Sequence, residues 1–171
     1  MALRTIRVYP SAVLRAETAA VERFDEELKT LVADMFETMY EAEGIGLAAP
    51  QVGVSLKVIV IDYQEQKYAL VNPVITKAEG EVIHEEGCLS FPGIYENVTS
   101  PEKITVEYFD ENGEKHVDEL EGFTATVFSH EIDHLKGRLL IDRVSPLKRQ
   151  FIKKKLAKRA AEKRHEHDND E

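Results

Sequence analysis

Tryptophan is absent from this chain of 171 residues, cysteine occurs once, and no apolar run approaches the roughly 18 residues that span a bilayer. A single cysteine excludes an internal disulfide, and Arg4 and Arg7 precede no sustained apolar stretch of the kind found in signal peptides. We therefore expect a cytoplasmic protein that does not enter membranes, because the reducing cytoplasm suits a free thiol. The hydrophobic content of 43% suffices for one domain with its own core.

One segment of the chain carries the residues of a metal site, His130-Glu131-Ile132-Asp133-His134. On a helix, residues i and i+4 share a face, so both imidazoles can reach one metal ion. Glu131 is rotated from His130 by about 100° and can stand beside the metal without binding it. This H-E-x-x-H pattern is typical of hydrolases in which a metal-bound hydroxide attacks a carbonyl and a carboxylate moves the proton.

The residues around this motif favour a buried helix over a surface helix with solvated histidines. Residues 123–128 are largely apolar, and Leu135 follows the motif directly. Buried histidine and glutamate side chains need partners, and a metal ion supplies one.

The third metal ligand has several candidates. Cys88 lies in residues 85–93, where glycine and proline exclude a helix. Its thiolate would bind zinc or ferrous iron, and with two histidines it leaves a fourth position for water. A lone cysteine is also often a small buried apolar residue. His84 and His116 are rival ligands, and composition does not choose among the three.

Residues 43–51 combine two glycines with an amide side chain. A phosphate-binding loop is a weak interpretation, because the later glycine and lysine of that motif are missing. Gly44 suits the position that ends the preceding helix, and Gly46 would let another backbone approach closely. Gln51 brings an amide that can donate a hydrogen bond to a developing oxyanion.

Three segments together, in this order and at similar spacings, resemble the peptide deformylases. They are Gly-Ile-Gly-Leu-Ala-Ala-Pro-Gln at 44–51, Glu-Gly-Cys-Leu-Ser at 86–90 and His-Glu-Ile-Asp-His at 130–134. Lesser similarities at Tyr9-Pro10, Val13-Leu14-Arg15 and Asn72-Pro73 extend the likeness from about residue 4 to about residue 150.

The resemblance implies a metal-dependent hydrolase that removes the formyl group from N-formylmethionine at the start of new polypeptides. By position, the metal ligands would be Cys88, His130 and His134, and Glu131 would be the general base and acid. The Gln51 amide and the Leu89 backbone N–H would stabilise the oxyanion. The backbone of the substrate would pair with two edges formed by Ile45, Gly46, Glu86 and Gly87. The family metal is typically ferrous iron, with zinc, nickel or cobalt as replacements.

The methionine side chain of such a substrate needs an apolar pocket, for which Ile45, Phe123 and Val127 are candidate walls. Ordinary core packing is the alternative for Phe123. Two other functions stay open. A metallopeptidase would share the H-E-x-x-H pattern but leave Cys88 and Gln51 unexplained, and a catalytically weak ribosome-associated binding protein would fit the basic end of the chain.

The sequence departs from the family at three positions. Ser129 stands where a glutamine usually precedes the H-E-x-x-H motif. Ser100 and Tyr95 stand near positions that often carry basic residues. We expect Ser100 to leave Glu86 without a cationic neighbour, which would alter the surroundings of the metal. Tyr95 removes a cationic contact to the substrate.

Periodicity predicts an α+β fold. Residues 25–43 have helical spacing, 56–62 and 68–75 are predicted strands, the second interrupted at Pro73, and 104–120 form a hairpin. Strands grouped before a late helix predict antiparallel or mixed sheets packed around the metal-binding helix, followed by a C-terminal helix.

Charge is segregated along the chain. Residues 148–164 hold nine Lys or Arg and one Glu, the last seven residues hold four acids, and residues 1–147 hold 13 basic and 27 acidic residues. We expect a catalytic domain over 1–147 and a basic helix with an acidic tail over 148–171. Leu147, Phe151, Leu156 and Ala160 have near-helical spacing and predict the apolar side of that helix. Similar extensions in the family contact ribosomes, so the helix would dock on ribosomal RNA or, alternatively, on the acidic body of a monomer.

Overall fold

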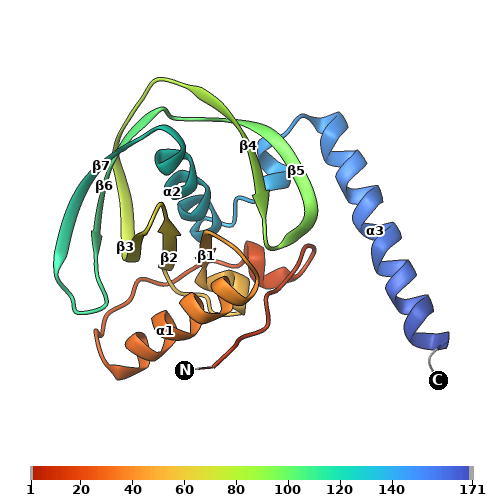
Figure 1. Ribbon diagram of the computed structural model, residues 1–171, viewed down its shortest axis with the longest axis horizontal. Helices are drawn as coiled ribbons and strands as arrows, with labels where there is room; N and C mark the ends of the chain where they lie inside the picture. The colour runs from red at the N-terminus through yellow and green to blue at the C-terminus, as the bar shows by residue number, and fades with distance from the viewer. Residues whose placement is uncertain (1, 170–171) are drawn as a thin grey trace.

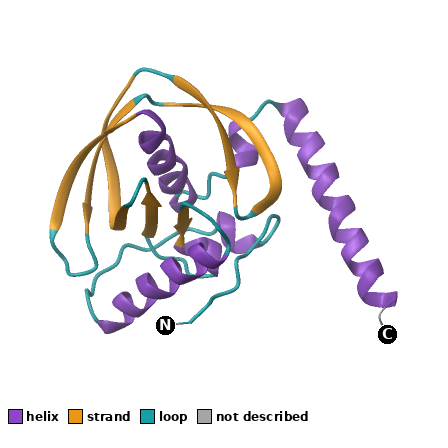
Figure 2. Ribbon diagram, in the orientation of Figure 1, coloured by secondary structure: helices purple, strands orange, loops and turns teal. Residues whose placement is uncertain are grey.

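The computed structural model describes residues 2–169, without the side chains of residue 160 and of residues 162–169. Three helices and seven strands make an α+β structure, as predicted (Figures 1 and 2). The helices are α1 (Glu26–Glu41), α2 (Gly122–Leu135) and α3 (Pro146–Asn169), and short 3₁₀ turns cover Ala12–Arg15, Ala49–Val52 and Leu140–Arg143. Among the helices of this part of the chain, none has both the length and the apolar character for a bilayer crossing.

The strands form two antiparallel sheets. The larger sheet has the order β1-β2-β3-β6-β7, and the smaller sheet pairs β4 with β5. The bounds are β1 Gly46–Ala48, β2 Val58–Tyr63, β3 Gln66–Glu79, β4 Val82–Cys88, β5 Phe91–Ser100, β6 Lys103–Phe109 and β7 Lys115–Glu121. The predicted hairpin at 104–120 is confirmed as β6 and β7.

The strand predicted at 68–75 is longer than expected and does not end at Pro73. It continues as β3 through a register break between Val71 and Val74. At that break Asn72 has a φ of 53°, and its side-chain amide bonds both the N–H and the C=O of Val21 at 2.8 and 3.0 Å. The proline therefore lies in a bulge, where its missing N–H costs no ladder hydrogen bond.

Helix α2 lies at the centre of the molecule, enclosed by strands of both sheets (Figure 1). Ten of its fourteen residues are buried, and its apolar residues share a core with β2, β3 and β6. The apolar stretch at 123–128 therefore marks a buried helix, as the sequence predicted. Helix α1 packs Leu31, Met35 and Met39 into a second core against β1 and β2.

The end of α1 differs from the prediction. The left-handed residue after the helix is Glu43, with a φ of 59°, and not Gly44. The amide of Gly44 still donates to the Met39 carbonyl at 2.9 Å, which closes the helix end. Gly44 needs to lack a side chain for another reason, because a Cβ there would lie 2.7 Å from a methyl group of Leu89.

Helix α3 extends away from the body of the molecule (Figure 1). Its apolar contact with the body is made by Ile152, which is 3% exposed, and by the partly buried Leu156. Leu147 and Phe151, predicted for the apolar side, are 79% and 74% exposed. That prediction was wrong for both, because the helix presents a different side to the core of β5 and the 3₁₀ turn 140–143. The side chain of Ala160 and the acidic tail beyond it lie outside the described side chains.

Candidate metal centre and cleft

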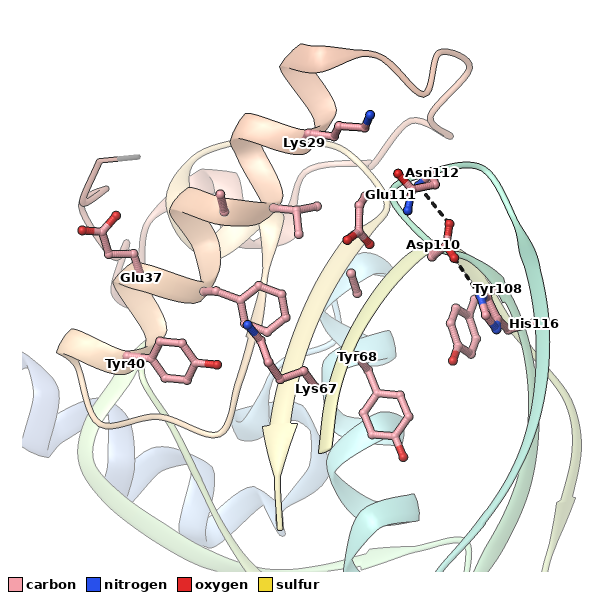
Figure 3. A pocket seen from close by; sticks show the side chains of 14 residues that line it. Lys29, Glu37, Tyr40, Lys67, Tyr68, Tyr108, Asp110, Glu111, Asn112 and His116 are labelled. Atoms are coloured by element: carbon pink, nitrogen blue, oxygen red, sulfur yellow. Dashed lines mark hydrogen bonds and ion pairs between the residues drawn. The ribbon is translucent and has the colours of Figure 1, made fainter. Parts of the chain in front are cut away.

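Two groups of described side chains have the spacing of a metal site. The first, Asp110, Glu114 and His116, lies at the turn between β6 and β7, beside a groove of about 890 Å³ between α1 and the larger sheet (Figure 3). The Asp110 carboxylate there already accepts the N–H groups of Asn112 and Glu114 and bonds His116 Nε2 at 2.8 Å. These contacts close the hairpin turn, and they account for the group without a metal.

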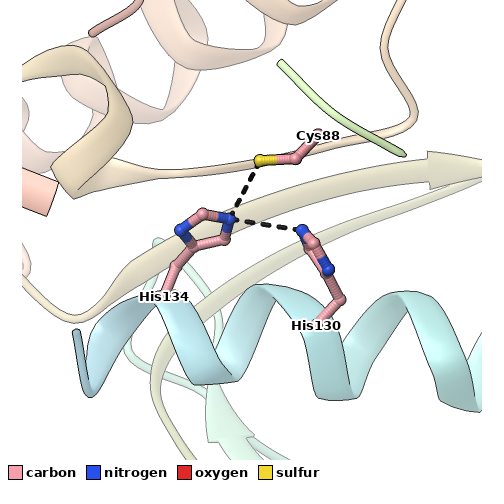
Figure 4. A group of neighbouring side chains, drawn as sticks. All are labelled: Cys88, His130 and His134. Atoms are coloured by element: carbon pink, nitrogen blue, oxygen red, sulfur yellow. Dashed lines mark hydrogen bonds between the residues drawn. The ribbon is translucent and has the colours of Figure 1, made fainter. Parts of the chain in front are cut away.

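The second group brings Cys88, at the end of β4, to the buried face of α2 (Figure 4). The Nε2 atom of His134 lies 3.3 Å from Cys88 Sγ and 3.2 Å from His130 Nε2. Both histidines come from one side of α2, as their spacing of four residues predicts.

The two rival ligands have other partners. His84 Nδ1 lies 2.9 Å from the Thr126 hydroxyl, and the His84 ring stands edge-on to Phe123. His116 belongs to the hairpin turn. Cys88 is therefore the candidate that joins the two histidines of the motif.

The chemistry of these three donor groups fits a metal ion. Glu86 Oε1 lies 2.9 Å from His130 Nδ1, so it can hold the proton on Nδ1 when a metal ion takes up the Nε2 lone pair. Burial and the nearby positive charges of His130 and Arg143 hold the pKa of His134 well below its ordinary value, which leaves that ring neutral. A sulfur and two ring nitrogens facing one another cannot all donate, and a cation among them would satisfy all three.

Glu131 stands beside this group and is not part of it. Its Oε1 lies 3.9 Å from His130 Nε2, and its Oε2 is buried without a hydrogen-bond partner. Burial raises the pKa of Glu131 to about 7, against the opposing charge of His130. A carboxyl group with such a pKa exchanges a proton readily near neutral pH.

The backbone of β1 lies close to the Glu131 carboxylate at Gly46. A Cβ on Gly46 would lie 3.0 Å from both Cγ and Oε1 of Glu131. The close neighbour of Gly46 is thus the side chain of Glu131 and not the second backbone that the sequence predicted, and the missing side chain brings the β1 backbone beside this carboxylate.

Gln51 is held rigidly next to Cys88. Its Oε1 accepts the N–H of Ala48 at 2.9 Å, and its Nε2 donates to Ser90 Oγ at 3.1 Å and lies 3.5 Å from Cys88 Sγ. The Ser90 hydroxyl in turn donates to the Arg7 carbonyl at 2.6 Å. The orientation of the Gln51 amide is therefore fixed, with its N–H₂ group directed toward the thiol. Leu89 follows Cys88 and lines the same cleft.

The expectation that Ser100 leaves Glu86 without a cation was wrong. Arg143, at the end of the 3₁₀ turn 140–143, donates from Nη1 to Glu86 Oε1 at 2.8 Å and from Nη2 to Ser100 Oγ at 3.0 Å. The side chains of Arg143 and Glu86 are 5% and 4% exposed, so this is a buried ion pair. Sequence reasoning missed Arg143 because it lies outside every motif.

A cleft of about 420 Å³ opens on the metal group. All six residues predicted to contact the substrate line it, namely Ile45, Gly46, Glu86, Gly87, Phe123 and Val127. Phe123 and Val127 also pack with the central core, which confirms core packing for Phe123, while its role as a wall for a methionine side chain stays a prediction. Tyr95 is exposed, and its ring covers Gly87 at the rim of the cleft. The Ser129 hydroxyl is buried without a partner, and nothing in the structure explains it.

Comparisons of the sequence and of the structure with known proteins identify the same family. Residues 3–150 match the family described as Polypeptide deformylase. A peptide deformylase of Neisseria gonorrhoeae is 49% identical over 162 residues, which cover 93% of this chain and 97% of that protein. The crystal structure of a peptide deformylase from Legionella pneumophila superposes with a TM-score of 0.89 at 46% identity, covering 94% of this chain and 97% of that one. One from Ehrlichia chaffeensis, in complex with actinonin, gives 0.90 at 36% identity, covering 93% and 98%.

We expect one Co²⁺ ion to bind per chain at Cys88, His130 and His134. A thiolate ligand gives Co²⁺ an absorption band in the near ultraviolet, and Cys88→Ser should remove that band. His116→Ala serves as the matched control and should leave it unchanged. Titration of metal-free protein followed by absorbance makes the measurement, and a band that survives in Cys88→Ser would contradict the assignment.

Proposed function

The chain belongs to the polypeptide deformylase family, hydrolases that remove the formyl group from the N-terminus of nascent polypeptides, and from this premise we propose how its residues divide the reaction. The observation that carries the proposal is the meeting of Cys88, His130 and His134 beside a partnerless buried carboxylate. The metallopeptidase alternative does not account for the contact between Gln51 and Cys88.

We assign Cys88, His130 and His134 as the metal ligands. The family is metal-dependent, and the bound metal supplies a Lewis acid that lowers the pKa of water. A nitrogen, nitrogen and sulfur donor set suits ferrous iron, zinc, nickel and cobalt alike, and we propose ferrous iron as the native metal.

Glu131 acts as the general base and then as the general acid. Its Oε2 has no protein partner, so it is free to accept a proton from water and deliver it to the leaving amine nitrogen. The pKa of about 7 supports both roles, because the group can hold or release a proton at neutral pH.

The Gln51 amide and the Leu89 backbone N–H are proposed to stabilise the developing oxyanion. Gln51 is suited to this because its carbonyl end is anchored to Ala48, which leaves the N–H₂ end beside the reacting centre. Donors held in place in this way contribute about 2.7–4 kcal/mol each in other enzymes.

The cleft supports recognition of a peptide by its main chain. The edges at Ile45–Gly46 and Glu86–Gly87 both line the cleft. We propose that they pair with an extended backbone, which tolerates any side chains beyond the first residue. Ile45, Phe123 and Val127 supply apolar walls for the methionine side chain. All these groups come from one chain, which supports a monomer, and the free thiol supports a cytoplasmic location.

Helix α3 is proposed to bind ribosomal RNA. Lys148, Lys153, Lys154, Lys155 and Lys158 are exposed, and the helix extends from the body where a large partner can reach it (Figure 1). We keep the division into a catalytic part (1–147) and a basic extension (148–171) as a proposal. Deleting 148–171 would be a poor test, because it removes the buried Ile152 from the core.

Glu131→Gln should lower formate release from a formyl-Met peptide by about 10²- to 10⁴-fold, because the amide cannot take a proton from water. The assay is run anaerobically with a fixed metal content. Glu119→Gln changes an exposed carboxylate on β7 that does not line the cleft, so it is the control and should keep its activity. Cleavage of internal peptide bonds instead of formate release would favour the metallopeptidase, and neither activity would favour a binding protein.

If iron is the native metal, air should inactivate the protein by oxidising the metal and the Cys88 sulfur. A nickel-loaded sample should keep its activity much longer under the same air. Activity against time in air, compared between the two loaded forms, measures the difference. Equal lifetimes would count against an iron–thiolate centre.

Changing Lys153, Lys154, Lys155 and Lys158 together to Gln should weaken ribosome binding and spare turnover of a short formyl peptide. If all four contact phosphates, the slope of log affinity against log salt should fall by about 3 to 4. The control changes Lys29, Lys77, Lys103 and Lys115 to Gln. It gives the same change in net charge at positions outside α3. Equal ribosome affinity for both variants would refute the proposal.

A further inference from the structure

Arg143 has a buried side chain close to the metal group, and the reaction described above gives it no role. Its guanidinium bonds Glu86 Oε1 at 2.8 Å and Ser100 Oγ at 3.0 Å, and its Nε lies 3.6 Å from Asp133 Oδ2. It comes from the 3₁₀ turn 140–143, outside both α2 and the smaller sheet, and it joins these two elements.

We propose that Arg143 is a positioning residue of the metal centre. It fixes the Glu86 carboxylate, and Glu86 in turn fixes the His130 ring with Nε2 toward Cys88 and His134. The inference rests on the proposed metal-ligand set, and it adds a residue that acts on the metal through two others.

The geometry at Glu86 supports this role. Oε1 accepts from both Arg143 Nη1 and His130 Nδ1, while Oε2 accepts from the Ser100 hydroxyl at 3.3 Å. Arg143 also bonds the Ser100 oxygen, so the arginine fork holds both ends of this small network. A carboxylate with such contacts has one orientation available, and the ring that it accepts from has one as well.

Burial makes the arginine necessary. The Glu86 side chain is 4% exposed, and a buried carboxylate without a cation is strongly unfavourable. Without Arg143, Glu86 would turn toward solvent or toward other donors and would release His130 Nδ1. The imidazole could then rotate, and its Nε2 would no longer be held toward the other two ligands.

Ser100, at the end of β5, lies within hydrogen-bond distance of the Glu86 carboxylate, which belongs to β4. Ser100 is 2% exposed, and the guanidinium of Arg143 fills the space beside its hydroxyl. An arginine at position 100 would therefore compete with Arg143 for the same carboxylate. Among the described side chains, the cation that pairs with Glu86 is Arg143, which comes from the 3₁₀ turn and not from β5.

The test measures metal retention and uses no substrate. Protein loaded with Co²⁺ is mixed with excess EDTA, and loss of the thiolate–Co²⁺ absorption gives the rate of metal release. Arg143→Met should release Co²⁺ about 10- to 100-fold faster than the parent. Arg143→Lys should lie between them, because it keeps the charge and loses the fork.

Two further variants separate positioning from general stability. The exchange variant Ser100→Arg/Arg143→Ser should recover slow release, because the cation returns to Glu86 from β5. Arg15→Gln removes a two-bond ion pair with Asp142 in the same 3₁₀ turn, at 2.7 and 3.0 Å, without touching Glu86. It should lower the thermal midpoint of the metal-free protein and keep the parental release rate.

Parental retention in Arg143→Met, or equally fast release from Arg15→Gln, would overturn the proposal. If Arg143→Met does not fold, Arg143→Lys decides, and parental retention there contradicts the role of the fork. A parent protein with no thiolate–Co²⁺ band would instead refute the metal centre itself. Absence of deformylase activity would leave the release rates and their meaning unchanged.

Discussion

The structure depends on one constraint, which is that α2 carries His130, Glu131 and His134 into an apolar core. Each of these polar side chains would be costly there alone. The end of β4 makes the arrangement possible, since Glu86 bonds one ring and Cys88 faces the other. The smaller sheet is held over α2 by these contacts and by a separate core around Phe91 and Leu140. The site therefore joins the two halves of the fold.

Much of this was predictable from sequence, because the information is local. The spacing of His130 and His134 places both rings on one side of a helix, and alternation between 104 and 120 predicts a hairpin. The class of fold followed from the order of these elements. Peptide deformylase membership followed from three short segments, whose order and spacing restrict the family far more than each segment alone.

The predictions that failed depend on contacts between residues that are far apart in the sequence. Glu86 was expected to lack a cation because residue 100 is a serine, but Arg143 supplies one, and positions 100 and 143 are 43 residues apart. No local pattern could reveal that they meet at one carboxylate. Similarly, helical spacing in 147–160 predicted an apolar side of the helix. Which side is buried depends on the core of β5, and this core contacts Ile152 and leaves Phe151 exposed. Gly44 shows a third case, because its lack of a side chain is required by Leu89 from a distant turn.

The contact between Gly46 and Glu131 limits how the cleft can change during evolution. Any side chain at residue 46 would push against the carboxylate, so a substitution there that weakened a bound compound would also displace Glu131. The neighbouring residue Ile45 is 40% exposed, and a compound that pairs only with the main chain of this edge makes no use of its side chain. A substitution of Ile45 would change its side chain and keep its backbone hydrogen bonds, so it would give little resistance to such a compound.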